Sequence, residues 1–407
     1  MGMAQPISAP RPIPIANPAS TVTPAQRLLS LDVLRGITIA FMIMVNNNGG
    51  PGSWRFMNHA QWNGLTPTDL VFPTFVFVVG ASIVFAFHAR IKRGATRAQL
   101  ARHTVQRAII IFALGLIVNG FPFFALDHFR VYGVLQRIAV CYLVVGLFYI
   151  WDQRVSTKIV AAIVAIVGYW VLLRYVPVPG AGMPGRDIPF MDQRFNLVSW
   201  LDRLIMPHHL YLEYGGLDPH NLRDPEGLLS NLPAIGTALL GLLTGLWLRG
   251  QRAAKSTAGG LAVAATSCLA LGYLWSLSFP LNKNLWTSSF VLVAAGWSLT
   301  VLTLSYLVMD VWGWGRGQSK WLVYPWLVLG SNAITAYMFS EIVPGILERI
   351  SFTSNGKPSN VLAWLADNVF IHMPTPGWAA FAFSFFTLAY CFIPVWIMYR
   401  KKIFVKV

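Results

Sequence analysis

Hydrophobic residues along the chain fall into ten long runs that are separated by shorter polar segments. Each run is close to the ~20 residues that a helix needs to cross about 30 Å of hydrocarbon. The pattern therefore predicts an all-α fold, a polytopic transmembrane helix bundle with about ten spans, within residues 27–407. The predicted spans cover residues 29–47, 68–89, 104–121, 131–150, 157–176, 231–248, 257–278, 287–309, 322–346 and 378–399.

Two segments outside these runs are long enough to have a character of their own. Residues 1–26 are rich in Pro, Ala, Ser and Thr and contain no apolar stretch. Such a composition predicts a disordered tail, placed in the cytoplasm by the charge pattern described below. Residues 177–230 form the longest predicted extracytoplasmic loop and are a candidate for a small structured cap.

Composition supports the membrane interpretation and the charge pattern orients the chain. The 407 residues are 55% hydrophobic and 11% charged, whereas soluble domains carry roughly 25% charged residues. A net charge of +16 raises the possibility of a nucleic-acid partner. However, the bases cluster in short loops between apolar runs, all on one side if ten spans alternate. The positive-inside rule then predicts that both termini are cytoplasmic, and we expect lipid and no nucleic acid as a partner.

The three cysteines offer no reactive or metal-binding chemistry. Cys141, Cys268 and Cys391 all lie within apolar runs and none has a partner at metal-site spacing. They are expected to be small buried hydrophobic residues. The sequence therefore predicts neither thiol catalysis nor a metal site.

Polar residues flank the first span unusually closely. Its uninterrupted apolar stretch runs only from Gly36 to Val45, with Asp32 and Arg35 before it and Asn46 after it. Charged groups at membrane depth cost about 2.5–3.5 kcal/mol each, which favours a functional role. The structural alternative is that Asp32 and Arg35, three residues apart on one helical face, neutralise each other.

The loop after this span contains residues suited to acid–base chemistry on a sugar. His59 has an unperturbed pKa near 6.5 as a residue type and can act as a general base. Asparagine amides can donate to an oxyanion, and an aromatic face such as that of Trp62 suits a sugar ring. The alternative is that His59 is an interface histidine, with Trp54 and Trp62 as membrane-interface anchors.

The segment Thr66-Pro67-Thr68-Asp69 opens the second span. Thr66 at the N-cap, Pro67 at the first helical position and Asp69 at the third approximate a capping box. A second possible role for Asp69 is to orient His59 by a hydrogen bond.

Two further polar insertions interrupt the apolar pattern. Arg137 lies inside the fourth span and needs an anion or a carboxylate partner. Lys283 lies in the link 282–286 before the eighth span and could neutralise an anionic group or pair with a carboxylate. The alternative for Lys283 is an exposed loop lysine.

Five segments together resemble one family. They are SLDVLRGITIAFMIMVNN, HAQWNGLTPTDLVFPTFVFVVG, GVLQRIAVCY, DPEGLLSNLPAIGTALLG and FPLNKNLWTSSF. They resemble the lysosomal heparan-α-glucosaminide N-acetyltransferase family, and above all its shorter bacterial relatives. The resemblance implies transfer of an acetyl group from cytoplasmic acetyl-CoA to a glucosamine amine across a bacterial inner membrane. The family's large lumenal N-terminal domain has no counterpart in this sequence, which leaves the acceptor open.

The resemblance also implies roles for individual residues. The family's catalytic histidine matches His59, in HAQWNG, and its catalytic asparagine matches Asn46. Between Asn46 and Trp54 this chain reads NNGGPGS and differs in length, so Asn47 and Asn48 remain alternatives. The expected acceptor-binding residues are Trp62, Asn63, Asp69, Lys283, Asn284 and Trp286, and those expected to bind acetyl-CoA are Arg35 and Arg137.

Two other functions remain open at the level of sequence. A transporter could carry a sugar or an anion along the same polar path, and an O-acyltransferase of an envelope glycan would differ only in its acceptor. A homodimer is expected.

Overall fold

Nine helices of the computed structural model are long and apolar enough to span a membrane, within the residues that the structure describes. These residues are 28–50, 52–124, 126, 129–211, 223–354 and 356–405. The helix pair Gly317–Ser331 and Ala333–Arg349, bent by 73°, supplies a tenth span if counted as one. The prediction of an all-helical bundle with about ten spans is thus confirmed. The predicted tail 1–26 lies outside the described residues.

The helices follow the predicted runs closely. Those before the long loop 177–230 are α1 (Leu29–Asn46), α2 (Val71–Ile91), α3 (Arg97–Gly120), α4 (Val134–Trp151) and α5 (Val155–Tyr175). Those after it are α7 (Asn231–Arg249), α8 (Ala254–Ser276), α9 (Ser288–Ser305), α10 (Lys320–Ser331), α11 (Ala333–Arg349) and α13 (Pro376–Arg400). Short turns precede α2 at η1 (Arg55–Met57) and η2 (Pro67–Leu70), and η4 (Tyr306–Val311) and η5 (Gly317–Ser319) connect α9 to α10.

Two loops contain structure that hydropathy does not predict. The loop 177–230 contains α6 (Leu197–Ile205), and the loop after α11 contains an antiparallel hairpin and a short helix. These are β1 (Ser351–Ser354), β2 (Lys357–Asn360), α12 (Val361–Asn368) and the turn η6 (Phe370–His372). Both segments pack at one end of the bundle, and the site described below lies at that end.

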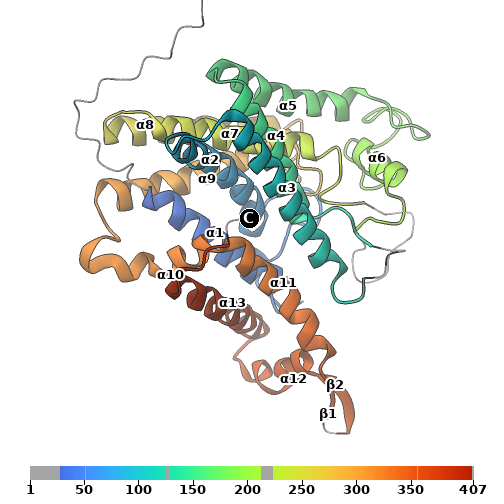
Figure 1. Ribbon diagram of the computed structural model, residues 1–407. Coiled ribbons are helices and arrows are strands. Elements are labelled where there is room, and N and C mark those ends of the chain that lie inside the picture. Colours follow the sequence, from blue (N-terminus) through green and yellow to red (C-terminus); the bar gives the residue numbers. More distant parts are fainter. Residues whose placement is uncertain are drawn as a thin grey trace, which may run out of the picture.

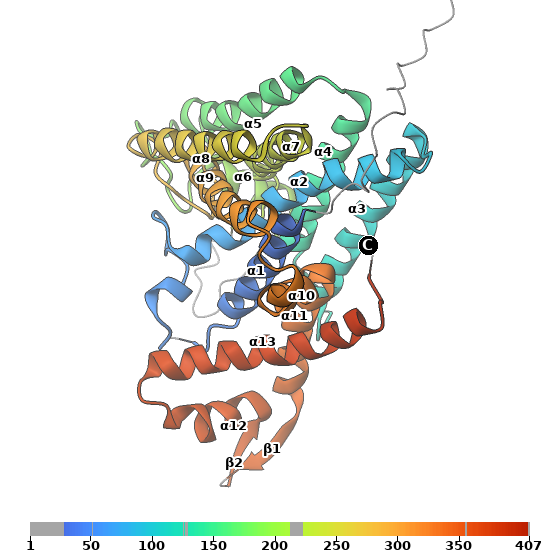
Figure 2. The same ribbon diagram turned by 90° about the vertical axis from the view of Figure 1, so that its left-hand side faces the viewer.

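Helix α1 runs through the middle of the molecule, between two groups of helices. It contacts α2 and α9 on one side and α10, α11 and α13 on the other, as Figures 1 and 2 show. Its first turn is fixed from outside, because the Asp310 carboxylate accepts hydrogen bonds from the backbone N–H groups of Leu29 and Ser30 at 3.1 Å. Such bonds satisfy two of the donors that a helix start leaves free.

Small residues allow the helices to pack closely. A Cβ added to Gly36 would lie 1.9 Å from the carbonyl oxygen of Trp326, where α1 crosses α10. A Cβ on Gly241 of α7 would lie 2.0 Å from the carbonyl oxygen of Phe77 on α2. Small residues at crossings are typical of membrane helix bundles, where close backbone approach replaces the hydrophobic effect.

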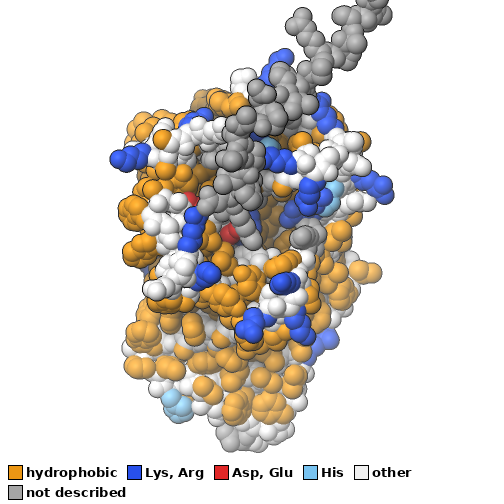
Figure 3. Space-filling view, turned by 60° about the vertical axis from the view of Figure 1, so that its left-hand side comes forward, with side chains coloured by type: hydrophobic (Ala, Val, Ile, Leu, Met, Phe, Trp, Pro, Cys, Tyr) orange, Lys and Arg blue, Asp and Glu red, His pale blue; other side chains and the backbone are white. Residues whose placement is uncertain are grey.

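The two ends of the bundle differ in chemistry. One end, here called the basic end, holds the α2–α3 connection and the chain end at 400–405, which lie at the right of Figure 2. The opposite end, here called the His59 end, holds the segment 47–66 and the α8–α9 link. Figure 3 shows Lys and Arg side chains over the upper and middle parts of the face in view, whereas hydrophobic side chains dominate its lowest part.

Candidate active site

The loop that carries His59 is held by hydrogen bonds from its own asparagines and threonines. The Asn48 side chain donates to Oδ1 of Asn58 at 2.8 Å, and the Thr66 hydroxyl donates to the Asn58 carbonyl at 2.7 Å. The Thr68 hydroxyl donates to the Phe56 carbonyl at 2.7 Å. These bonds fix the backbone directly before His59, while 44% of the His59 side-chain surface stays open.

Asp69 fixes the imidazole and the start of η2 with the same carboxylate. Its Oδ1 lies 2.7 Å from Nδ1 of His59. Its Oδ2 accepts from the backbone N–H groups of Thr66 at 2.9 Å and Ala60 at 3.2 Å. The predicted capping box of Thr66 and Asp69 is therefore confirmed. Because a carboxylate can only accept here, Nδ1 carries the proton, and neutral His59 presents Nε2 as its basic nitrogen.

Lys283 reaches His59 from the α8–α9 link. Its Nζ lies 3.1 Å from Nε2 and 3.2 Å from Nδ1. Burial of the ring and the charge of Lys283 lower the pKa of His59, and the Asp69 carboxylate opposes this lowering. A lysine partner therefore favours the neutral, proton-accepting form of the ring.

The α8–α9 link and the His59 loop are joined directly. The Asn282 side chain donates to Oδ1 of Asn63 at 3.1 Å, and the backbone N–H of Gly64 donates to the Leu281 carbonyl at 2.8 Å. Two predicted site residues, Asn63 and Lys283, are thus brought to one place although 220 residues separate them. Half-buried Asn284 lies in the same turn.

Two predicted aromatic residues are positioned differently from each other. Trp62 is half-buried and its indole N–H donates to the Met191 carbonyl in the loop 177–211 at 3.0 Å. Trp286 is fully buried, and its N–H donates to Oγ1 of Thr237 at 3.1 Å. Since the Trp286 ring packs against Phe72 and Phe290, it belongs to the core beneath the site and has no surface for an acceptor.

A carboxylate cluster that the sequence did not single out adjoins Lys283. Asp224 accepts from the Arg130 guanidinium at 2.8 Å through both oxygens, and Glu226 accepts from the same group at 2.5 Å. The two carboxylates raise the pKa of Arg130 against the effect of its burial. The charge of Arg130, that of Arg137 and that of Lys283 lower the pKa of Glu226 against the effect of its burial. The only sequence signal was a pair of acids in DPEGLL, directly before an apolar run.

Arg137 lies at the His59 end and not with Arg35. It is fully buried, and its guanidinium lies 4.8 Å from the ring centroid of Trp286. It donates to the Ser230 hydroxyl and to the Gly227 carbonyl. These partners fix the turn after Glu226, so the structure does not bring Arg137 and Arg35 together.

The three consecutive asparagines after α1 have different surroundings. Exposed Asn46 donates from Nδ2 to Oε1 of Glu341 on α11 at 3.1 Å. Asn47 donates to the Ile43 carbonyl at 3.1 Å, at the end of α1. Asn48 braces the His59 loop, as described above. All three line a cavity of about 700 Å³ whose other walls include Phe370 and Phe383. Asn46 differs from Asn47 and Asn48, because its amide donates to a side chain on α11 and not to a nearby backbone carbonyl.

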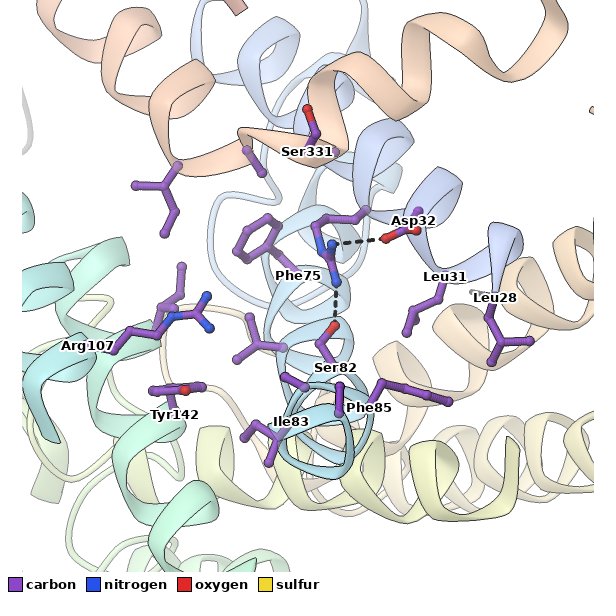
Figure 4. A pocket seen from close by; sticks show the side chains of 18 of the residues that line it. Leu28, Leu31, Asp32, Phe75, Ser82, Ile83, Phe85, Arg107, Tyr142 and Ser331 are labelled. Atoms are coloured by element: carbon purple, nitrogen blue, oxygen red, sulfur yellow. Dashed lines mark hydrogen bonds and ion pairs between the residues drawn. The ribbon is translucent and has the colours of Figure 1, made fainter. Parts of the chain in front are cut away.

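The basic end opens into a large cavity. It measures about 940 Å³ and reaches between α1, α2, α3 and α4. Arg35 donates to Asp32 at 3.3 Å and to the Ser82 hydroxyl at 2.6 Å, so the expected Asp32–Arg35 pair is present. Arg107 lies 4.7 Å from the ring centroid of Tyr142 (Figure 4). The basic lining residues are Arg35, His88, Lys92, Arg93 and Arg107.

The bend between α10 and α11 forms one wall of this cavity. Asn332 at the bend donates from Nδ2 to the Ile403 carbonyl at 3.1 Å and accepts from the Val405 N–H at 2.8 Å. Ser331, Ala333 and Val405 all line the cavity. The polar Asn332 inside span nine thus anchors the chain end against the cavity.

A family model matches the part of the chain that contains α1 to α8. The model of "Heparan-alpha-glucosaminide N-acetyltransferase, catalytic" matches residues 27–279, more than half of the chain. The chain belongs to this family. It is therefore a multi-pass member of a transmembrane acetyltransferase family, as the five sequence segments indicated.

Two relatives are heparan-alpha-glucosaminide N-acetyltransferases of mammals. The mouse protein is 29% identical over 372 residues, which are 80% of this chain and 55% of the mouse protein. The human protein is 29% identical over 361 residues, 78% of this chain and 53% of the human protein. The chain spans about half the length of these curated relatives.

Proposed function

We propose that this chain is an acetyl-CoA-dependent N-acetyltransferase of a bacterial inner membrane, acting on a glucosamine-type amine at the periplasmic side. The observation that carries the proposal is the pairing of a carboxylate-held histidine at one end with a basic cavity at the other. Asp69 leaves Nε2 of His59 free to accept a proton. The 940 Å³ cavity has the charge and volume for a phosphorylated donor.

Acetyl-CoA would bind in the cavity at the basic end. Its phosphates carry several negative charges, which guanidinium and ammonium groups recognise in phosphate sites. Arg107 and Arg35 line the deeper part, while Lys92 and Arg93 come from the end of α2. We place this end in the cytoplasm because the basic loops gather there. We therefore keep Arg35 as a donor-binding residue. We no longer propose that Arg137 binds acetyl-CoA, because its partners Gly227 and Ser230 lie at the His59 end.

The acceptor would meet the acetyl group between His59 and Asn46. The amine nitrogen attacks the acetyl carbonyl carbon, its proton passes to Nε2 of His59, and the carbon–sulfur bond breaks to release the CoA thiolate. The Asn46 amide would donate to the carbonyl oxygen as negative charge develops on it. Asp69 would stabilise the imidazolium through Nδ1–H. Trp62, Asn63 and Asn284 would border the acceptor.

Direct transfer and passage through an acetyl-histidine use the same Nε2. Mixing the protein with radiolabelled acetyl-CoA alone distinguishes them, because only the second route leaves label on the protein before acceptor is added. The expected homodimer stays a prediction, and the mass of the detergent-solubilised protein tests it.

Release of CoA thiol by the purified protein tests the proposal. We expect release that requires acetyl-CoA and an amino-sugar acceptor and that is lost in His59→Ala. The control is His372→Ala, an exposed histidine at the same end that should leave release unchanged. Glucosamine, muropeptides and buffer alone serve as acceptor conditions.

Two outcomes would replace the proposal. Flux of sugar or anion into vesicles without acyl-CoA, unaffected by His59→Ala, would support the transporter. Acetylation of a glycan hydroxyl in place of an amine would support the O-acyltransferase.

A further inference from the structure

Lys283 lies over the face of the His59 ring and not along either of its N–H axes. Its Nζ is almost equally distant from the two ring nitrogens, at 3.1 and 3.2 Å. Those nitrogens flank Cε1, so an atom this close to both within the ring plane would collide with that carbon. The in-plane position at Nδ1 is in any case occupied by the Asp69 carboxylate. The lone pair of Nε2 therefore remains free in the ring plane.

The position of Lys283 is fixed by its own link. The Asn282 side chain accepts from the backbone N–H of Leu285 at 2.8 Å, and the backbone N–H of Trp286 donates to the Lys283 carbonyl at 3.1 Å. Within the described part of the chain, the two His59 nitrogens are the polar atoms that contact Nζ, and no carboxylate forms an ion pair with it. Burial lowers the pKa of Lys283, and the charges of Glu226 and Asp69 oppose this lowering. In its protonated form, a lysine held in this way acts on the ring by its charge.

Three charged groups face His59 from three different segments. Asp69 comes from η2, Lys283 from the α8–α9 link and Glu226 from the segment before α7. Asp69 favours the imidazolium and makes the in-plane hydrogen bond at Nδ1. Lys283 is the group that disfavours the imidazolium, since like charges repel.

We propose that Lys283 is a positioning residue that acts through His59, its ammonium group over the ring face keeping the imidazole neutral and its Nε2 available as a base. This inference rests on the proposed function for its catalytic meaning, but the electrostatic effect exists without any substrate. Lys283 thereby widens the pH range over which the base is competent. It also speeds loss of the proton from His59 after each transfer, because the imidazolium is a stronger acid beside a cation.

The charge state of His59 can be measured without an acceptor. Diethyl pyrocarbonate reacts with neutral imidazole, so the modification rate of the His59 peptide against pH, followed by mass spectrometry, gives the midpoint of its titration. Lys283→Met should raise this midpoint by about 0.5–1 pH unit, the effect of one charge at this distance in a partly hydrated site. Lys283→Arg should keep the wild-type midpoint.

A chemical rescue protects the test against a folding defect. Lys283→Cys treated with 2-bromoethylamine regains an ammonium group at nearly the original reach. We expect the untreated variant to have a raised midpoint and the treated variant the wild-type midpoint. If acetyl transfer is detected, the acid limb of kcat/KM should move with these midpoints. Equal midpoints in wild type and in folded Lys283→Met would overturn the inference, whereas loss of acetyltransferase activity alone would concern only the proposed function.

Discussion

Asp69 holds His59 at 2.7 Å with one carboxylate oxygen and caps the start of its own helix with the other. The orientation of the His59 ring and the local fold thus depend on a single side chain. Because the helix start fixes the carboxylate, the imidazole is oriented before any substrate binds, which is the preorganisation that favours general-base catalysis.

Asp69→Asn should lower kcat by about 10²–10⁴-fold. The amide oxygen would turn to the backbone donors of Thr66 and Ala60 and leave its NH₂ group facing Nδ1. His59 would then accept at Nδ1 and carry its proton on Nε2, the wrong tautomer for a base. CoA release kinetics measure the effect. Asp187→Asn, at an exposed ion pair with Arg186, is the control and should keep the wild-type rate.

The pH profile of kcat/KM should have an acid limb with a midpoint below 6.5. Burial and Lys283 lower the pKa of His59 from its ordinary value of 6.5. The free base therefore persists to lower pH than for an unperturbed histidine, and activity falls only when the ring is protonated. A midpoint above 6.5 in a rate profile with saturating acetyl-CoA would contradict this expectation.

Asn46→Ala and Asn48→Ala should fail in different ways. Asn46 reaches across to Glu341 and is exposed to the cavity, so its loss should lower kcat about 10²-fold, like the loss of one oxyanion donor, with little change in thermal stability. Asn48 braces the backbone at Asn58, so its loss should lower the stability of the loop by about 1 kcal/mol. Paired melting curves and rates separate the two, and a rate loss confined to Asn48→Ala would shift the assignment.

Arg107→Met should raise the KM for acetyl-CoA by about ten- to a hundredfold and change kcat little. Arg107 lines the cavity beside Tyr142, and one charged hydrogen bond to a phosphate contributes about 1.5–3 kcal/mol. The matched control is Arg194→Met at the His59 end, which should leave this KM unchanged. A large fall in kcat without a KM effect would remove Arg107 from the donor site.

Asp202→Asn should stabilise the protein above pH 7 and not below pH 4. Burial raises the pKa of Asp202 to about 7, whereas an exposed aspartate has a pKa near 3.8. The native state therefore loses stability as pH rises from about 4 to 7, because the unfolded chain ionises first. The amide can still accept from the Leu228 N–H, as Oδ1 does. Thermal melts at pH 4 and 8 should show a gain of at least about 1 kcal/mol only at the higher pH.

The spans could be predicted because lipid imposes one length and one composition on every helix. Even the bend in span nine lies at the polar Asn332, although its role in anchoring the chain end needs contacts with Ile403 and Val405 that no local pattern contains. The hairpin after α11 was not predicted, because its strands are only four residues long and leave little pattern in the sequence.

The candidate site was predictable where its residues are close in sequence. His59, Asp69 and Thr66 lie within eleven residues, and helix-capping chemistry indicated the position of Asp69. The partners from distant segments were harder to predict. Lys283 was singled out, but its contact to His59 was not predicted. Neither Glu226 nor Arg130 was singled out. Arg137 was expected in the donor site, whereas its guanidinium packs against the ring of Trp286.

Helix α1 sets the distance between the two ends of the proposed site. Arg35 near its start and Asn46 at its end are separated by eleven residues, about 16 Å along an unbroken helix. Under the proposed function, an acyl carrier anchored by its phosphates beside Arg35 would have to extend its thioester over roughly that length, and a carrier with a short arm would not reach Asn46.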